Sequence, residues 1–189
     1  MTSLAEKVLA LDDALAAFDA PHAFGGALAL AFHIAEPRGT RDIDINVFVP
    51  ASDAPAVFAA LPDPIEWGAS DMQEAQRDGQ VRVFWDDTPV DLFFDTHPFH
   101  QVAAGHVEVA PFGGRDVPIL AADDLAVFKA FFNRTKDWAD IEAMIDAHTL
   151  DIHAVLGWIV DLIGPNDRRV ARFREVMHRI PPSEPRFTP

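Results

Sequence analysis

The chain has 189 residues, no cysteine and a formal net charge of −15, from 30 acidic residues against 15 lysines and arginines. This length suits one compact domain, or one domain with a helical extension, and argues against a second full domain. With 49% apolar and 24% charged residues the composition is that of a globular protein, and the lack of cysteine excludes disulfides, zinc–thiolate sites and thiol catalysis.

The sequence offers no segment for export or membrane insertion. Five charged residues interrupt the stretch 5–20, so it cannot serve as the apolar region of a signal peptide. No later segment approaches the roughly eighteen apolar residues that a transmembrane helix needs. We therefore predict a cytoplasmic protein without a membrane partner.

The charge is spread unevenly along the chain. Residues 164–189 contain six arginines against three acidic residues, a net charge of +3, which leaves −18 for residues 1–163. Such an acidic body repels phosphate, so a nucleotide or nucleic acid must be attracted by local cations, by bound metal or by the arginine-rich end. On their own, these arginines are more simply explained as the solvated face of a terminal helix.

The first part of the chain alternates helical and strand patterns. Apolar residues recur at three- and four-residue steps over 3–19, which predicts an amphipathic helix. The alanine- and leucine-rich segment 27–35 predicts a short buried helix. Residues 42–49 alternate apolar and polar side chains, as a half-buried strand does, and Ser52 is expected to cap a helix that runs through Ala60.

The rest of the chain divides into strands and then helices. Four β-type runs form two hairpins, and four helical patterns follow, the last of them with Pro165 in its first turn. The predicted strands are 81–85, 90–94, 107–109 and 117–120. The predicted helices are 123–133, 136–147, 150–163 and 165–180.

These elements predict an α+β fold, in which a small mixed β-sheet with flanking helices is followed by a helical C-terminal part. We place the α+β core at residues 1–121 and the helical part, packed on the core, at residues 122–180. The proline-rich residues 181–189 are expected to form a mobile tail.

Two aspartates at the start of the predicted strand carry the strongest chemical signal. Because side chains alternate along a strand, Asp42 and Asp44 project from one face while Ile43 turns to the core. Two carboxylates so placed repel each other, and a divalent cation with oxygen ligands relieves the repulsion. Asp-x-Asp is also common at exposed strand ends. Asp91, which interrupts an apolar run, is either a third ligand from a neighbouring strand or a strand-edge residue that faces solvent.

A glycine pair precedes the short buried helix. Gly25 and Gly26 lack side chains, so the backbone there can approach a triphosphate, and the N-terminus of the following helix offers N–H groups to phosphate oxygens. A lone Gly-Gly is usually only a turn. Here it lies one helix before the Asp42-x-Asp44 strand, which favours a phosphate site beside a metal site.

Three segments, taken together, resemble a known family. Residues 24–33 (FGGALALAFH), 38–45 (RGTRDIDI) and 125–141 (LAVFKAFFNRTKDWADI) are similar to ordered motifs of the AbiEii/MenT-type nucleotidyltransferase toxins, a branch of the DNA polymerase β-like superfamily. The resemblance covers roughly residues 23–145 and implies a sheet of the polymerase β-like type. Gly26 departs from the superfamily, where this position is usually serine, and leaves the phosphate to backbone groups.

The resemblance implies a two-metal reaction and the residues that perform it. Asp42, Asp44 and Asp91 would hold magnesium, or manganese, against a nucleoside triphosphate. Lys129 would bind the triphosphate as a catalytic residue, and Asp140 would act as a supporting carboxylate. The further nucleotide-binding residues that we expect are Gly25, Gly26, Thr40, Arg41, Lys136 and Asp137.

Without the resemblance, the residues of the third motif have a simpler explanation. If residues 123–147 form one helix, Lys129, Lys136 and Asp140 lie on a single polar stripe. Lys136 and Asp140 would then be an ordinary pair on a solvated helix face.

Three histidines could suggest a transition-metal site. His97 and His100 have a suitable spacing, but no further ligand cluster accompanies them, so we interpret both as loop residues. His33 lies among apolar helix residues and is predicted to be a core histidine, although the family tends to place a histidine there.

The sequence thus predicts a nucleotidyltransferase toxin of a toxin–antitoxin system. It would transfer a nucleoside monophosphate to an RNA acceptor, the 3′ end of tRNA, and a separately encoded antitoxin would neutralise it. The acceptor and the antitoxin rest on the resemblance alone. Two alternatives stay open: nucleotidylation of a protein or of a small hydroxylated molecule such as an antibiotic, and a non-catalytic module, antitoxin-like, that binds a nucleotide or a partner.

Overall fold

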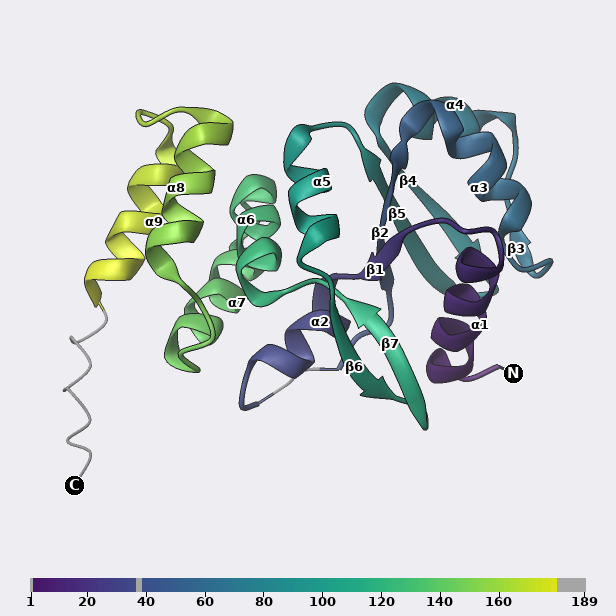
Figure 1. Ribbon diagram of the computed structural model, residues 1–189, viewed down its shortest axis with the longest axis horizontal. Helices are drawn as coiled ribbons and strands as arrows, with labels where there is room; N and C mark the ends of the chain where they lie inside the picture. Colours follow the sequence, from purple (N-terminus) through teal and green to yellow (C-terminus); the bar gives the residue numbers. More distant parts are fainter. Residues whose placement is uncertain (1, 37–38, 180–189) are drawn as a thin grey trace. The chain divides into compact units, whose positions relative to one another are not determined.

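The computed structural model describes residues 2–36 and 39–179. The tail expected at 181–189 and the last residue of the helix expected at 165–180 lie outside the described residues, as do Pro37 and Arg38 of the second motif. The chain divides into two compact units, Met1–Ala121 and Ala122–Pro189, each with buried apolar residues of its own (Figure 1).

The first unit contains a seven-stranded mixed sheet in the order β3-β4-β5-β2-β1-β7-β6. β2 is parallel to β5, and β1 is parallel to β7, whereas the other neighbours are antiparallel. The strands are β1 (His22–Phe24), β2 (Ile43–Pro50), β3 (Ile65–Glu66), β4 (Gln80–Trp85), β5 (Thr88–Asp95), β6 (Glu108–Phe112) and β7 (Arg115–Ile119).

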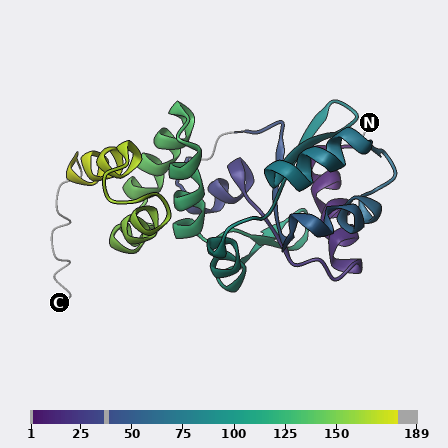
Figure 2. The ribbon, with the colours of Figure 1, turned by 90° about the horizontal axis from the view of Figure 1, so that it is seen from above.

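Helices pack on both faces of this sheet (Figures 1 and 2). On one face α4 packs on β4, and α3 lies between α4 and α1. On the other face α2 packs on β2, and α5 contacts β2 and β5. The helices are α1 (Leu4–Ala17), α2 (Gly26–His33), the 3-10 turn η1 (Ala51–Asp53), α3 (Ala54–Ala60), α4 (Ala69–Asp78) and α5 (Pro98–Gly105).

The central strands separate an apolar face from a polar one. On β2, Ile43 and Ile45 are at most 1% exposed, and Val90 and Leu92 of β5 are fully buried on the same side. The alternate residues of β2, β4 and β5 point to the opposite face, where acidic and basic side chains meet. The alternation that predicted the strand 42–49 is therefore the feature that places its aspartates outside the core.

A buried lysine fastens α1 to the turn between β4 and β5. The Lys7 side chain is 3% exposed, and its ammonium lies 3.2 Å from the carboxylate of Asp86. It donates to the carbonyl oxygen of Trp85 at 2.7 Å and to the hydroxyl of Thr88 at 2.9 Å. These three oxygens compensate the cost of burying the charge.

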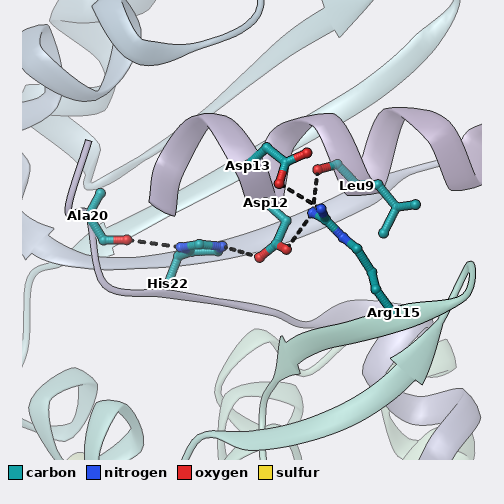
Figure 3. A network of polar contacts seen from close by, with 6 residues as sticks. All are labelled: Leu9, Asp12, Asp13, Ala20, His22 and Arg115. Atoms are coloured by element: carbon teal, nitrogen blue, oxygen red, sulfur yellow. Dashed lines mark hydrogen bonds and ion pairs between the residues drawn. The ribbon is translucent and has the colours of Figure 1, made fainter. Parts of the chain in front are cut away.

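A second polar network ties α1 to β1 and to the β6–β7 hairpin (Figure 3). The guanidinium of Arg115 donates to Asp13 at 2.6 Å, to Asp12 at 2.8 Å and to the carbonyl oxygen of Leu9 at 2.9 Å. The other carboxylate oxygen of Asp12 lies 3.1 Å from Nε2 of His22. The short strands β1 and β7 are thereby held by charge as well as by backbone pairing.

The second unit consists of four described helices with a core that includes Trp138 and Ile141. The residues 123–147 do not form one helix, because Asn133 takes a left-handed conformation with φ +59° and ends the first of two. The helices are α6 (Ala122–Phe132), α7 (Thr135–Asp146), α8 (Ile152–Ile163) and α9 (Arg168–Arg179). No described helix in the chain is long and apolar enough to cross a membrane.

The α+β fold class is confirmed, but two predicted helix starts are wrong. Asp53, not Ser52, precedes α3, and the Ser52 hydroxyl contacts Asp53 at 3.3 Å instead of capping a helix. Pro165 precedes α9, which begins at Arg168; Asp167 accepts a hydrogen bond from the Arg169 backbone N–H at 2.8 Å. Sequence patterns also missed β1, β3, α4 and α5.

Candidate active site

A row of three charged side chains crosses the polar face of the sheet. Asp44 of β2 is the register partner of Asp91 of β5, and Asp91 is in turn the partner of Arg82 of β4. Asp42 lies two residues before Asp44, next to the first residue of β2. The strand pairing therefore brings the three aspartates of the sequence prediction to one region, together with an arginine that the prediction lacked.

Arg82 holds both carboxylate oxygens of Asp91. Its Nε donates to Oδ1 at 2.7 Å and its terminal nitrogen donates to Oδ2 at 2.6 Å, a two-pronged pairing. The hydrogen bonds to Asp91 raise the pKa of Arg82 above its ordinary value, and the negative charges of Asp91, Asp42 and Asp44 raise it further. All three aspartates thus act electrostatically on one guanidinium.

The two partners of this pair differ in exposure. The Asp91 side chain is 14% exposed, whereas that of Arg82 is 52% exposed. Asp91 is therefore not a strand-edge residue that faces solvent, because β5 lies between β4 and β2 and its carboxylate binds a guanidinium of the protein itself; its role as a third metal ligand stays a prediction. Arg82 could have been recognised from the hairpin register, since a two-residue turn at Asp86 and Asp87 places residue 82 opposite residue 91.

The glycine pair lies directly against Asp44. The Gly25 N–H donates to the backbone carbonyl of Asp44 at 2.8 Å. Gly26 has φ +53°, and a Cβ atom on it would lie 1.7 Å from the Oδ2 atom of Asp44. The Asp44 carboxylate thus occupies the space that a serine side chain would need, which accounts for glycine at this position.

Thr40 and Arg41 precede the first aspartate. The Thr40 hydroxyl is hydrogen-bonded to the Oδ1 atom of Asp42, and it also lies 3.3 Å from the Asp42 backbone N–H as an acceptor. Thr40 therefore fixes the orientation of the Asp42 carboxylate. Arg41 is exposed.

The predicted residues of the third motif interact within the second unit. Lys129 donates to Asp140 at 2.7 Å, and both side chains are buried. The fully buried Asp137 accepts from the Arg134 guanidinium at 2.7 and 3.0 Å and from the Arg134 backbone N–H at 3.0 Å, which caps α7. Lys136 is exposed. The break at Asn133 thus replaces the single polar stripe with two helices that the Lys129–Asp140 pair joins.

The histidines take structural places. His33 is 6% exposed, as predicted for a core residue, and its Nε2 lies 2.8 Å from the carbonyl oxygen of Leu120. His97 and His100 belong to α5 rather than to a loop: His97 caps the helix and His100 lies within it. Burial lowers the pKa of His100, although Asp95 at 4.0 Å acts in the opposite direction.

The carboxylates at this site are chemically suitable ligands for a divalent cation, but their side chains are not arranged around a common point. Asp42 and Asp44 supply hard oxygen donors on one strand, and Gly26 leaves room for the Asp44 carboxylate. Across residues 2–36 and 39–179, however, no group of three or more histidine or acidic side chains is arranged to hold a metal ion. The residues therefore fit a cation held by Asp42 and Asp44, while Arg82 binds both carboxylate oxygens of Asp91.

Three solved structures are similar in fold to this chain. The solution structure of the antibiotic-resistance factor ANT(2'')-Ia is 13% identical, with a TM-score of 0.60 over 93% of this chain and 97% of that one. Its crystal structure with adenylyl-2''-tobramycin is 15% identical, with a TM-score of 0.58 over 90% and 97%. The lincomycin-bound lincosamide adenylyltransferase LnuA is 14% identical, with a TM-score of 0.51 over 75% and 96%.

The fold is therefore the one that ANT(2'')-Ia and LnuA have, a mixed sheet with flanking helices and a helical C-terminal part. At these identities the likeness defines the fold and nothing finer. No protein-family model and no curated protein matches the sequence.

Proposed function

We propose that the protein is a metal-dependent nucleotidyltransferase, which transfers a nucleoside monophosphate from a nucleoside triphosphate to an acceptor hydroxyl. The observation that carries this proposal is the placement of Asp44 beside Asp91 on neighbouring strands, with Asp42 two residues before Asp44. The fold supports the same class of reaction, because LnuA is an adenylyltransferase and ANT(2'')-Ia was solved with an adenylylated product.

Each residue of the site has a separate task in this reaction. Asp42, Asp44 and Asp91 would hold the metal, and Thr40 orients the carboxylate of Asp42. Bound magnesium or manganese would supply charge compensation for the triphosphate and the departing pyrophosphate. The acceptor oxygen bonds to the α-phosphorus as the bond to pyrophosphate breaks, and the proton of the acceptor hydroxyl is released to solvent.

The phosphate-binding residues remain part of the proposal. The backbone at Gly25 and Gly26 lets the triphosphate approach the site, and Arg41 is exposed beside it. Lys129 is proposed to bind the triphosphate, with Asp140 supporting its position through their ion pair. Lys136 and Asp137 complete the proposed nucleotide-binding set, with Asp137 acting through the start of α7.

The acceptor that we favour is a small hydroxylated molecule. The likeness to ANT(2'')-Ia extends over 93% of this chain and 97% of that one, and that protein was solved with adenylyl-2''-tobramycin. Residues 1–121 hold 19 acidic against 6 basic residues, a formal net charge of −13, which disfavours a polyanionic acceptor near the candidate site. A small neutral or cationic molecule meets no such barrier.

An RNA acceptor is the second candidate, in the form of a toxin that modifies the 3′ end of tRNA and is neutralised by an antitoxin. The resemblance to the AbiEii/MenT-type toxins supports it, as do the exposed Arg168, Arg172 and Arg174 of α9. Two arginines of α9 also make contacts within the protein: Arg169 binds Asp167, and the guanidinium of Arg172 lies 4.6 Å from the centroid of the Trp138 ring.

The test is a transfer assay with a labelled nucleotide. Each labelled nucleoside triphosphate is incubated with the protein, magnesium and one acceptor class: tobramycin and lincomycin as small probes, total RNA, or total protein. We expect label on a small hydroxylated acceptor, and a loss of about a hundredfold or more in Asp44→Asn, because a metal ligand is removed. Asp63→Asn, an exposed acid outside the site, is the matched control and should retain activity.

The assay separates the candidates. Label on RNA that is lost in Asp44→Asn would favour the tRNA-modifying toxin, and label on protein would favour protein nucleotidylation. Absence of transfer to every class, with the nucleotide still bound, would contradict the enzymatic proposal and favour a non-catalytic binding module. The thermal midpoint of each variant, measured beside the wild type, excludes loss of the fold as the cause.

A further inference from the structure

We propose that Arg82 stands in for a divalent cation at the three aspartates of the ligand-free protein, and that loading the cation requires Arg82 to release Asp91. This inference rests on the function proposed above. It assigns a role to a residue that neither the sequence motifs nor the fold likeness identifies. The geometry that points to it is the row Asp44, Asp91 and Arg82 across three adjacent strands.

The charges around Arg82 explain why a cation is needed there. Three carboxylates on adjacent strands repel one another, and the repulsion is relieved by a nearby positive charge. Arg82 provides that charge, since it binds both oxygens of Asp91 and also interacts with the charges of Asp42 and Asp44. A metal ion near the same carboxylates would provide the same compensation and would be repelled by the guanidinium.

The exposure of the two partners shows which of them can move. Asp91 is 14% exposed and lies in the middle of three paired strands, so its carboxylate keeps its place. Arg82 is 52% exposed and projects from β4 on a long side chain. Exposed ion pairs are weak because water screens them, so a change of partner costs Arg82 little. The guanidinium is therefore the exchangeable member of the pair.

A purely structural role for Arg82 makes the opposite prediction. If the pair only joins β4 to β5, then removing Arg82 leaves cation binding unchanged or weakens it by disturbing Asp91. If Arg82 competes with the cation, removing its charge strengthens cation binding. The direction of the change in cation affinity therefore decides between the two roles.

The experiment measures binding of Mn²⁺ to the full chain without nucleotide, from the free Mn²⁺ signal in electron paramagnetic resonance. We expect Arg82→Gln to bind Mn²⁺ about tenfold more tightly than the wild type, because a nearby like charge has been removed. Arg77→Gln is the matched control: Arg77 forms a similar two-pronged pair with Asp78, at 2.8 and 2.6 Å, on the exposed face of α4. Its Mn²⁺ affinity should equal that of the wild type.

Three results would overturn the inference. The first is an Mn²⁺ affinity of Arg82→Gln that is equal to or weaker than that of the wild type. The second is an equal gain in Arg77→Gln, which would indicate a general effect of net charge. The third is a gain that persists in the double variant Arg82→Gln with Asp44→Asn, where it should disappear, because the ion would then lie elsewhere. Asp44-dependent nucleotidyl transfer without a gain in Arg82→Gln would refute only the role of Arg82. Tighter Mn²⁺ binding by Arg82→Gln without any nucleotidyl transfer would support the cation site but refute the proposed activity.

Discussion

Two carboxylate–cation pairs of the same chemistry lie in opposite surroundings. On the sheet of the first unit, Arg82 is 52% and Asp91 14% exposed; among the helices of the second unit, Lys129 is 6% and Asp140 8% exposed. In the buried pair neither charge can turn to water, so each depends on the other. In the open pair one partner can leave. We therefore expect the buried pair to be a fixed element that keeps Lys129 in position, and the open pair to be exchangeable.

The largest effect is expected from breaking the buried pair. Lys129→Met leaves the Asp140 carboxylate without its cation in an apolar setting, and we expect a loss of about 3–5 kcal/mol in the free energy of unfolding. Urea denaturation followed by circular dichroism measures it. The double variant Lys129→Met with Asp140→Leu removes both charges and should recover much of that loss. A single variant as stable as the wild type would show that the pair is not the fixed element described here.

The open pair should contribute much less to stability. Arg82→Gln removes a half-exposed guanidinium whose ion pair is screened by solvent, so we expect at most about 1 kcal/mol of destabilisation. The same urea denaturation measures this, with Arg77→Gln as the control for loss of one exposed arginine. A loss as large as that of Lys129→Met would contradict the contrast between the two pairs.

The smallest expected effect concerns His100. Its contact with Asp95 is less exposed than the Arg82–Asp91 pair and more exposed than the Lys129–Asp140 pair. Burial lowers the pKa of His100 below its ordinary value of 6.5, and the charges of Asp95 and His97 act on it as well. The unfolded chain then binds the proton more readily than the folded one, so His100 lowers stability as the pH falls below 6.5. Above that pH, His100 no longer lowers the stability of the folded protein.

The check compares His100→Gln with the wild type in urea midpoints at about pH 7.5 and about pH 5.5. The wild type should lose more stability between these values than the variant does, because the variant lacks the titrating group. The control is His153→Gln, an exposed histidine of α8, which should leave the pH dependence unchanged. Parallel pH curves for wild type and His100→Gln would rule out this contribution.

The helices and strands in which apolar residues recur at regular spacing were predicted from the sequence, and the others were not. β2 was recognised because Ile43, Ile45 and Val47 alternate with Asp42, Asp44 and Asn46. β1 and β3 have only three and two residues, too few for a period to show. In α4 Ala75 alone is buried, so no apolar stripe marks the helix. α5 was hidden by Pro98, which in fact occupies the first turn.

The sequence predicted the residues of the candidate site that depend on strand alternation, but not those that depend on which residues pair across neighbouring strands. Alternation alone put Asp42 and Asp44 on one face. The partner of Asp91 depended on the hairpin turn, because the strands expected at 81–85 and 90–94 pair Arg82 with Phe93, whereas the observed two-residue turn pairs it with Asp91. The end of the helix expected at 123–133 was predicted to within one residue, since α6 ends at Phe132, just before the left-handed Asn133. The length of the hairpin turn, which composition does not record, made the difference at Arg82.

The chain contains three lysines, and their surroundings make them reporters for chemical labelling. Lys7 and Lys129 are buried and bound to oxygen partners, one in each unit, whereas Lys136 is exposed. An acylating reagent should therefore modify Lys136 in the native protein, apart from the terminal amine, and reach the other two only when their unit opens. Mass spectrometry of a timed acylation would thus follow the opening of each unit separately, without any engineered probe.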